Sequence, residues 1–126
     1  MTSWFDINSL DRSAMTIQDG YKNVSQSELR ESTAIVAKLI DEESAALGSS
    51  SNVFVGGFSQ GCAVSLASFL TYKSILGGVV GLSGMHALDL DWAKEVDIEL
   101  KKQTKVFVYH GKSDPLIPAA FSKQIY

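Results

Sequence analysis

A serine flanked by glycines, at residues 57–61, is the part of this sequence whose spacing could support covalent catalysis. These residues read Gly-Phe-Ser-Gln-Gly, a GxSxG pattern centred on Ser59. Residues 53–55 before it form a β-branched and aromatic run typical of a buried strand, and small residues typical of a close-packed helix follow it. In a nucleophile elbow the serine occupies a strained strand-to-helix turn, so the residues two before and two after it must lack bulk. The pattern therefore predicts a nucleophilic Ser59, with a plain helix-capping serine as the alternative.

Acyl transfer by a serine also needs a base, a carboxylate that orients the base, and amide donors for the oxyanion. The backbone N–H of Gln60, the residue after the serine, is the candidate oxyanion donor. Asp114 is the candidate carboxylate, because it follows a later strand in a loop that also contains Pro115 and Pro118. A turn-forming role alone is the alternative for Asp114.

The base is the missing member, because the chain has only two histidines and neither follows Asp114. Triads built on this elbow run in the order serine, carboxylate, histidine. His110 lies at a strand end, where we expect it to hydrogen-bond the backbone of its own loop. His86 is expected to be a solvated loop residue. Cys62 lies one turn into the helix after the serine and is expected to pack as a small apolar residue.

The bulk composition predicts one globular domain in a reducing compartment. The chain has 126 residues, a net charge of −3 and a single cysteine, which excludes an internal disulfide. No basic run favours a nucleic acid partner. Residues 1–10 lack a secretory signal, and no apolar run is long enough to span a membrane. The default location is therefore the cytosol.

Hydrophobic spacing predicts alternating helices and strands. A helix should begin at a Ser25/Glu28 capping box and end at Gly48, with one face made of these apolar residues: Leu29, Val36, Leu39, Ile40 and Leu47. Residues 1–23 should form a loop that packs Trp4 and Phe5 on the core, which we favour over an acyl-binding wall. The further elements are a strand at 53–56, a helix at about 60–73, a strand at 79–82, a weak helix near 92–100, a strand at 106–109 and a helix opening over 119–126.

This alternation predicts an α/β fold with a parallel sheet and right-handed crossovers. The strand at 79–82 is apolar without alternation, which favours a parallel strand covered on both faces. Each strand ends in residues that could take part in chemistry, and the carboxyl ends of parallel strands meet at one edge. Because ligands bind at that edge in open α/β sheets, we place the site there.

Four stretches in this order resemble the acyl-protein thioesterase branch of the phospholipase/carboxylesterase family of α/β-hydrolases. They are Ser-Trp-Phe-Asp-Ile at 3–7, Gly-Gly-Phe-Ser-Gln-Gly at 56–61, Gly-Leu-Ser-Gly at 81–84 and His-Gly-x-x-Asp-Pro-x-x-Pro at 110–118. The resemblance implies that Ser59 is the nucleophile, that Asp114 is the triad acid and that Gln60 supplies one oxyanion amide. It implies hydrolysis of long-chain acyl thioesters on protein cysteines (depalmitoylation), or of related lipid esters. It further implies a cytosolic and nuclear enzyme without cofactor or metal.

The family pattern also extends beyond this sequence at both ends. By the resemblance, residues 1–126 are a single incomplete α/β-hydrolase domain, with a three-stranded parallel sheet core and flanking helices. The strands with the second oxyanion loop and the segment with the triad histidine would lie outside it, so we expect weak or no turnover from the chain alone. A non-catalytic relative that binds acyl chains or a partner is the alternative. The elbow strand would have one unpaired apolar edge, which favours self-association.

Overall fold

A computed structural model of the chain describes residues 3–7, 23–115, 117 and 119. Its elements are α2 (Gln26–Leu47), the 3₁₀ helix η1 (Ser50–Asn52), β1 (Phe54–Phe58), α3 (Gln60–Thr71), β2 (Gly78–Leu82), α4 (Leu90–Ala93), α5 (Ile98–Lys101) and β3 (Val106–Tyr109). The predicted strands and the two long helices are confirmed within a few residues. The helix expected over 119–126 and most of the loop expected over 1–23 lie outside the described residues.

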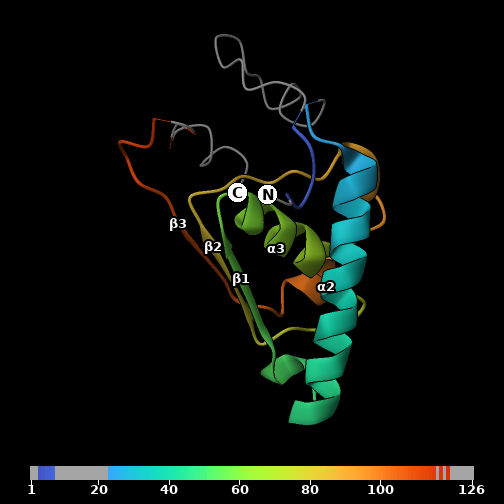
Figure 1. The fold of residues 1–126 in the computed structure, drawn as a ribbon. Helices are drawn as coiled ribbons and strands as arrows, with labels where there is room; N and C mark the ends of the chain where they lie inside the picture. The colour runs from blue at the N-terminus through green and yellow to red at the C-terminus, as the bar shows by residue number, and fades with distance from the viewer. Residues whose placement is uncertain (1–2, 8–22, 116, 118, 120–126) are drawn as a thin grey trace.

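The three strands form one parallel sheet in the order β1-β2-β3. Phe58 pairs with Leu82, and Leu82 pairs with Tyr109, so the carboxyl ends of the strands are level with one another. The α/β architecture with a parallel sheet is thereby confirmed. The segments that follow β1, β2 and β3 leave the sheet at the same edge, at the top of the view in Figure 1.

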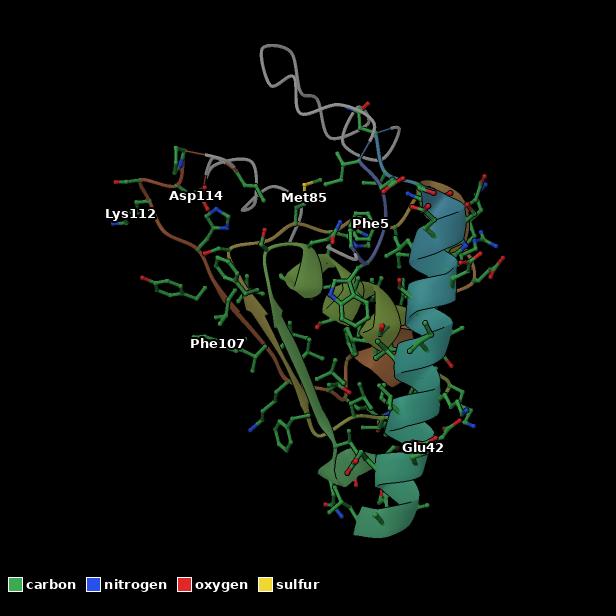
Figure 2. All side chains as sticks on the ribbon, viewed as in Figure 1. Phe5, Glu42, Met85, Phe107, Lys112 and Asp114 are labelled. Carbon is green, nitrogen blue, oxygen red and sulfur yellow. The ribbon has the colours of Figure 1, made fainter. Side chains whose placement is uncertain are left out.

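In the described part of the chain, the helices cover only one face of the sheet. Figure 1 shows α2 and α3 on the same side of the strands. The cause is topological, because right-handed crossovers between strands added in one direction put every connecting helix on the same face. The prediction of strands covered on both faces is therefore wrong here, since Phe54 is 70%, Phe107 60% and Val80 36% exposed. Figure 2 shows Phe107 pointing away from the helices.

The core lies between the covered face of the sheet and the two long helices. From Cys62 to Phe69 every residue of α3 is buried, and the small side chains among them let α3 lie close to the strands. Helix α2 buries Leu29 and Ile40 against this layer. Leu39 was predicted to be buried but is 52% exposed, because it lines a cavity of about 290 Å³. The cavity lies beside the edge of β1 that has no partner strand among the described residues, called the unpaired edge below.

Residues 3–7, called the strap below, cross from the amino end of α2 toward the carboxyl end of β1. Ile7 forms an antiparallel bridge with Val24, and the N–H of Ser25 donates to the carbonyl of Asp6 at 3.0 Å. The predicted capping box is wrong in its contacts, because the carboxylate of Glu28 accepts from the N–H of Asp6 at 2.5 Å. Ser25 is still the N-cap residue, but its side chain makes no capping bond. The strap therefore takes the role that the capping box would have had.

The weak helix expected near residues 92–100 is two short helices. Asp89 caps α4 by accepting from the N–H of Trp92 at 3.0 Å, and Asp97 caps α5 by accepting from the N–H of Leu100 at 3.0 Å. Asp97 lies within the expected helix. An aspartate side chain that binds a backbone N–H two or three residues ahead starts a new helix, so the segment is interrupted.

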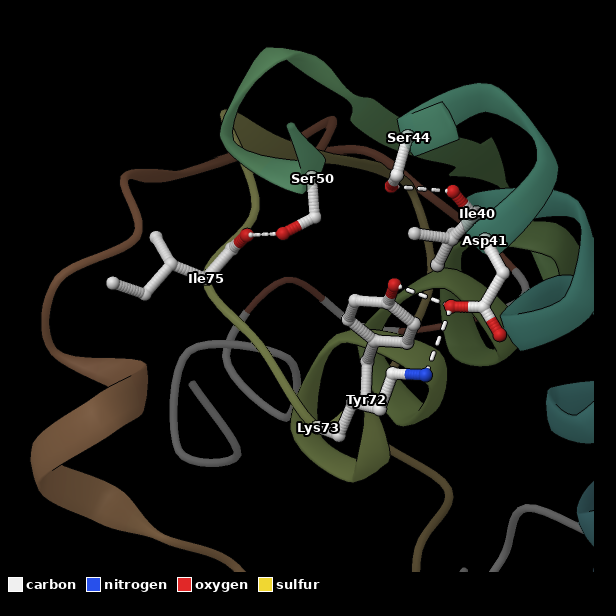
Figure 3. A network of polar contacts seen from close by, with 7 residues as sticks. All are labelled: Ile40, Asp41, Ser44, Ser50, Tyr72, Lys73 and Ile75. Atoms are coloured by element: carbon white, nitrogen blue, oxygen red, sulfur yellow. Dashed lines mark hydrogen bonds and ion pairs between the residues drawn. The ribbon is translucent and has the colours of Figure 1, made fainter. Parts of the chain in front are cut away.

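A polar network holds α2 against the end of α3 at the opposite end of the sheet (Figure 3). The hydroxyl of Tyr72 donates to Asp41 Oδ1 at 2.7 Å, and Lys73 Nζ lies 3.3 Å from the same oxygen. The hydrogen bond from Tyr72 lowers the pKa of Asp41, while burial raises the pKa of Tyr72. Nearby, Ser50 Oγ donates to the carbonyl of Ile75 at 2.6 Å. These bonds therefore fix the position of α2 relative to α3 at this end of the sheet.

Candidate active site

Ser59 occupies the strained turn between β1 and α3 that its sequence pattern predicts. Its backbone lies at φ 54° and ψ −117°, in a region that non-glycine residues rarely adopt. The N–H of Ser59 donates to the carbonyl of Leu82 at 2.9 Å. The carbonyl of Ser59 accepts from the N–H groups of Cys62 at 3.1 Å and Ala63 at 3.3 Å. These bonds join the turn to the next strand on one side and to the first turn of α3 on the other.

The two glycines of the pattern have different roles in the described structure. A Cβ on Gly57 would lie 2.2 Å from both the carbonyl carbon and the carbonyl oxygen of Gly61, and 2.7 Å from the nitrogen of Cys62. The requirement for a small residue is therefore confirmed at Gly57. It is wrong at Gly61, where a Cβ would meet nothing within 4 Å, because this residue lines the cavity beside β1.

Cys62 lies in the first turn of α3, next to the elbow, and its side chain is fully buried. Its expected packing role is therefore confirmed. Its Sγ would lie 2.9 Å from a Cβ on Gly81 and 2.6 Å from one on Gly84. The thiol therefore occupies the space that these glycines leave. Ser83, at the end of β2, also has a positive φ of 49°, and its N–H donates to the carbonyl of Tyr109 at 2.8 Å.

Gln60 is the first residue of α3 and contributes to the site through both its backbone and its side chain. The N–H groups of a first helical turn have no carbonyl partner within the helix, so the Gln60 N–H is suited to an oxyanion. The side-chain Oε1 accepts from the N–H of Trp4 at 3.0 Å, and Nε2 donates to the carbonyl of Phe5 at 2.6 Å. This second contribution is not predictable from local sequence, because residues 4 and 60 are far apart in the chain.

A small crevice of about 80 Å³ lies beside Ser59. Its walls come from the strap, the elbow and the loops after β2 and β3, and it is lined by Phe5, Ile7, Val24, Ser59, Gln60, Ala63, Met85, Ala87 and Ile117. Figure 2 shows Phe5 and Met85 on this side of the molecule. Phe5 is 4% exposed and belongs to the core, so its expected packing role is confirmed, while its ring also forms a wall of the crevice.

Asp114 lies at the same edge of the sheet, in the loop after β3 (Figure 2). Its Oδ1 accepts from the N–H of Ile117 at 3.0 Å, and its Oδ2 lies 3.3 Å from His110 Nε2. That nitrogen also donates to the carbonyl of Ile117 at 2.7 Å, which confirms that His110 binds the backbone of its own loop. Because Ile117 also lines the crevice beside Ser59, the Asp114 carboxylate is one contact away from the crevice wall. The structure thus groups Ser59 and Gln60 directly, and Asp114 through Ile117.

His86 differs from its expected state as a solvated loop residue. Its ring is largely shielded from water, with Nδ1 buried, and this burial lowers the pKa of His86 below its usual value. The neighbouring residues Met85 and Ala87 form part of the crevice wall, so the loop after β2 packs inward. The apolar residues Met85, Ala87 and Leu88 around His86 are the sequence signal for this inward packing, which the expectation of a solvated loop overlooked.

Within residues 3–7, 23–115, 117 and 119, no three metal-ligating side chains of the His, Cys, Asp or Glu type cluster together. In the same residues, no helix is both long enough and apolar enough to cross a membrane.

Comparison with known proteins gives a match over the whole sequence. Residues 1–126 match the family described as phospholipase/carboxylesterase. The acyl-protein thioesterase 1 of Yarrowia lipolytica is 36% identical over 124 residues, which are 98% of this chain and 51% of that protein. The acyl-protein thioesterase 1 of Neurospora crassa is 35% identical over 118 residues, 93% of this chain and 47% of that protein. The chain thus spans about half the length of these curated relatives.

Solved structures give the same fold. The crystal structure of Arabidopsis thaliana SOBER1 superimposes with a TM-score of 0.79 at 31% identity, over 97% of this chain and 54% of that chain. The predicted α/β-hydrolase fold is therefore confirmed for the part that the chain contains.

The contrast between the two glycines of the elbow gives a stability prediction. Gly57→Ala should lower the free energy of unfolding by about 3 kcal/mol, because its Cβ has to displace backbone atoms. Gly61→Ala should leave it within about 0.5 kcal/mol of the wild type, or raise it, because the position is open and helical. Urea denaturation followed by tryptophan fluorescence measures both. Equal losses in the two variants would contradict the contact described here.

The burial of His86 gives a pH prediction. Because its folded pKa lies below the unfolded value of about 6.5, the unfolded chain binds more protons in the window just below that value. The free energy of unfolding should therefore fall as pH drops through this window. His86→Gln should make that pH slope less steep by up to about one proton. Denaturation of both proteins between neutral and mildly acidic pH measures the slopes, and identical slopes would refute the assignment.

Proposed function

The chain belongs to the phospholipase/carboxylesterase family, and from that membership we propose that it is a serine hydrolase of the acyl-protein thioesterase type with Ser59 as its nucleophile. The observation that carries the proposal is the backbone of Ser59. It combines a positive φ with a position between β1 and α3, at the mouth of an apolar crevice. A serine that merely capped a helix would not need this strained conformation.

In the proposed reaction, Ser59 Oγ attacks the carbonyl carbon of an acyl thioester while a base takes its proton. The oxygen that becomes negative is stabilised by backbone donors, one of them the N–H of Gln60. The carbon–sulfur bond then breaks, and the cysteine thiol leaves with the proton from the base. Water then attacks the carbonyl carbon of the acyl-serine while the base takes a proton from it, and the ester bond to Ser59 Oγ breaks as the base returns that proton to Oγ, which releases a fatty acid.

Asp114 is proposed as the carboxylate that orients the base. Support comes from its place at the carboxyl edge of the sheet and from the bond between Oδ1 and Ile117, which fixes the carboxylate direction. His110 is a poor candidate for the base, since its Nε2 donates to the carbonyl of Ile117. We therefore propose that residues 1–126 are one incomplete hydrolase domain, and that both the base and the second oxyanion donor come from sequence outside it.

The proposed substrates are proteins with long-chain acyl thioesters on cysteine, as in depalmitoylation, or related lipid esters. The apolar lining of the crevice beside Ser59 supports an acyl chain as the group bound there. The names of the two fungal relatives as acyl-protein thioesterases support a thioester over other acyl bonds. The proposal includes a role in fatty acid metabolism and a location in the cytosol and the nucleus.

We also propose that copies of the 126-residue chain self-associate through the unpaired edge of β1 and the open face beside it. Phe54 lies at that edge and is 70% exposed, and Phe58 at the other end of the strand is 69% exposed. An unpaired strand edge next to exposed apolar side chains is a template for association.

The nucleophile can be tested with a fluorophosphonate probe, which labels activated serines. We expect slow labelling of the 126-residue chain, at least about 100-fold slower than a longer product of the same gene that carries a downstream Gly-His segment, because general-base help is absent. Ser59→Ala should abolish labelling in both polypeptides. Mass spectrometry of the labelled peptide identifies the modified residue.

Ser83→Ala is the matched control for this test, because Ser83 also ends a strand with a positive φ but opens no helix. It should keep the labelling of its parent. Labelling that persists in Ser59→Ala would refute the proposed nucleophile. Rapid labelling of the 126-residue chain itself would show that the base lies within it.

Self-association can be tested by sedimentation velocity at increasing concentrations of the 126-residue chain. We expect larger species to form at high concentration. Phe54→Lys should reduce them, because a charge at a strand edge opposes pairing. Ile98→Lys is the control, since Ile98 is similarly exposed, at 60%, but lies on α5. A monomer at all concentrations, or equal effects of both substitutions, would refute the proposal.

A further inference from the structure

We propose that the side chain of Gln60 is a positioning residue, which couples the strap to the nucleophile elbow. The inference rests on the proposed function only in treating Ser59 and the Gln60 N–H as parts of a catalytic site. The coupling itself is a property of the fold. It assigns a role to the side chain of a residue whose backbone alone was predicted to matter.

The two bonds of the Gln60 side chain have opposite polarity. Oε1 accepts from the N–H of Trp4 at 3.0 Å, while Nε2 donates to the carbonyl of Phe5 at 2.6 Å. A carboxamide is the side-chain group that presents one acceptor and one donor on the same planar end. Alanine can make neither bond, and an ionised glutamate can make only the bond to Trp4. The site therefore selects glutamine by its hydrogen-bonding pattern.

These bonds link two walls of the crevice beside Ser59. The ring of Phe5 forms one wall, and Gln60 itself stands at the start of α3. When the side chain of Gln60 holds Phe5, it also restrains the backbone that carries the candidate oxyanion N–H. A shift of the strap would therefore alter the acyl wall and the direction of that N–H together. Small displacements of this kind have large effects on the rate of acyl transfer.

The strap has separate anchors on α2, which supply a comparison within the same segment. Ser32 Oγ donates to the carbonyl of Trp4 at 2.5 Å, and Glu28 accepts from the N–H of Asp6 at 2.5 Å. Loss of Ser32 Oγ would loosen the strap from α2 but leave its link to the elbow intact. Loss of the Gln60 amide would do the reverse. The two substitutions thus distinguish the effect of a loosened strap from the effect of a lost link between the strap and the elbow.

The experiment compares Gln60→Ala with Ser32→Ala and with Asn52→Ala. The last removes a side-chain amide that donates to the carbonyl of Leu47 at 3.0 Å, far from the site. Amide hydrogen exchange at Trp4 should become about tenfold faster in Gln60→Ala, because the bond that protects this N–H is lost. It should stay near the wild-type rate in Ser32→Ala and Asn52→Ala.

The second measurement is fluorophosphonate labelling of Ser59, with one long-chain and one short-chain alkyl probe. Gln60→Ala should slow labelling by the long-chain probe about tenfold, and by the short-chain probe less, because the displaced wall contacts the longer chain. Asn52→Ala should match the wild type with both probes, and Ser32→Ala should lie between the two.

A conservative variant adds a pH test. In Gln60→Glu the carboxylate cannot donate to the carbonyl of Phe5 at neutral pH, but the protonated acid can. At pH 7 this variant keeps the bond from Trp4 and loses only the bond to Phe5, so the protection of the strap should lie between that of the wild type and that of Gln60→Ala. It should rise toward the wild-type level near the usual glutamate pKa of about 4.3. The wild type should show no such recovery, since its amide does not titrate.

The exchange and labelling measurements each have an outcome that overturns the proposal. Trp4 exchange in Gln60→Ala equal to that in Asn52→Ala would show that the side chain does not hold the strap. Equal labelling losses in Gln60→Ala and Ser32→Ala would show that strap order alone matters. If the wild type is not labelled at Ser59, the proposed function fails, whereas exchange at Trp4 still decides whether Gln60 couples the two segments.

Discussion

The backbone of Ser59 is held in a strained conformation with a positive φ by contacts with its neighbours. Such a conformation costs about 1–3 kcal/mol in a residue with a side chain, so its neighbours have to stabilise it. The carbonyl of Leu82 binds its N–H, and two amides of α3 bind its carbonyl. Gly57 lets the first turn of α3 approach to a distance that no side chain would permit. The direction of the Ser59 hydroxyl therefore depends on the correct pairing of β1 with β2.

The order of the strands explains both what the site contains and what the sheet lacks. Because β1, β2 and β3 are added in one direction, their carboxyl ends bring Ser59, Ser83 and His110 to one edge. The same order, with right-handed crossovers, puts the connecting helix α3 on one face, and α2 packs on that side as well (Figure 1). A connecting helix could reach the other face only if the strand order reversed. The site edge and the open face are thus two consequences of a single topological rule.

The elements of the fold could be predicted from the sequence because their signals are local. Continuous apolar runs identified the three strands, and helical spacing identified the two long helices. Burial was harder to predict. An apolar side chain such as Leu39 indicates that burial would be favourable, but it does not indicate which element of the fold covers it. Contacts between distant segments were not predictable either. Glu28 binds the strap instead of capping its own helix, and the ring of His86 is largely shielded from water because its loop packs inward.

The same distinction between local signals and contacts across the chain applies to the predicted site residues. The position of Ser59 follows from spacing within five residues, and its strained turn is confirmed. The catalytic roles of Ser59, Gln60 and Asp114 remain predictions, since they depend on a base that residues 1–126 do not supply in the expected order. The side chain of Gln60 shows why a motif alone understates a site. The elbow fixes the backbone of Gln60. Its side-chain amide is required by hydrogen bonds to Trp4 and Phe5, which lie more than fifty residues away in the sequence. A residue that serves two segments in this way constrains both, so the shape of the crevice and the direction of the donor are set together.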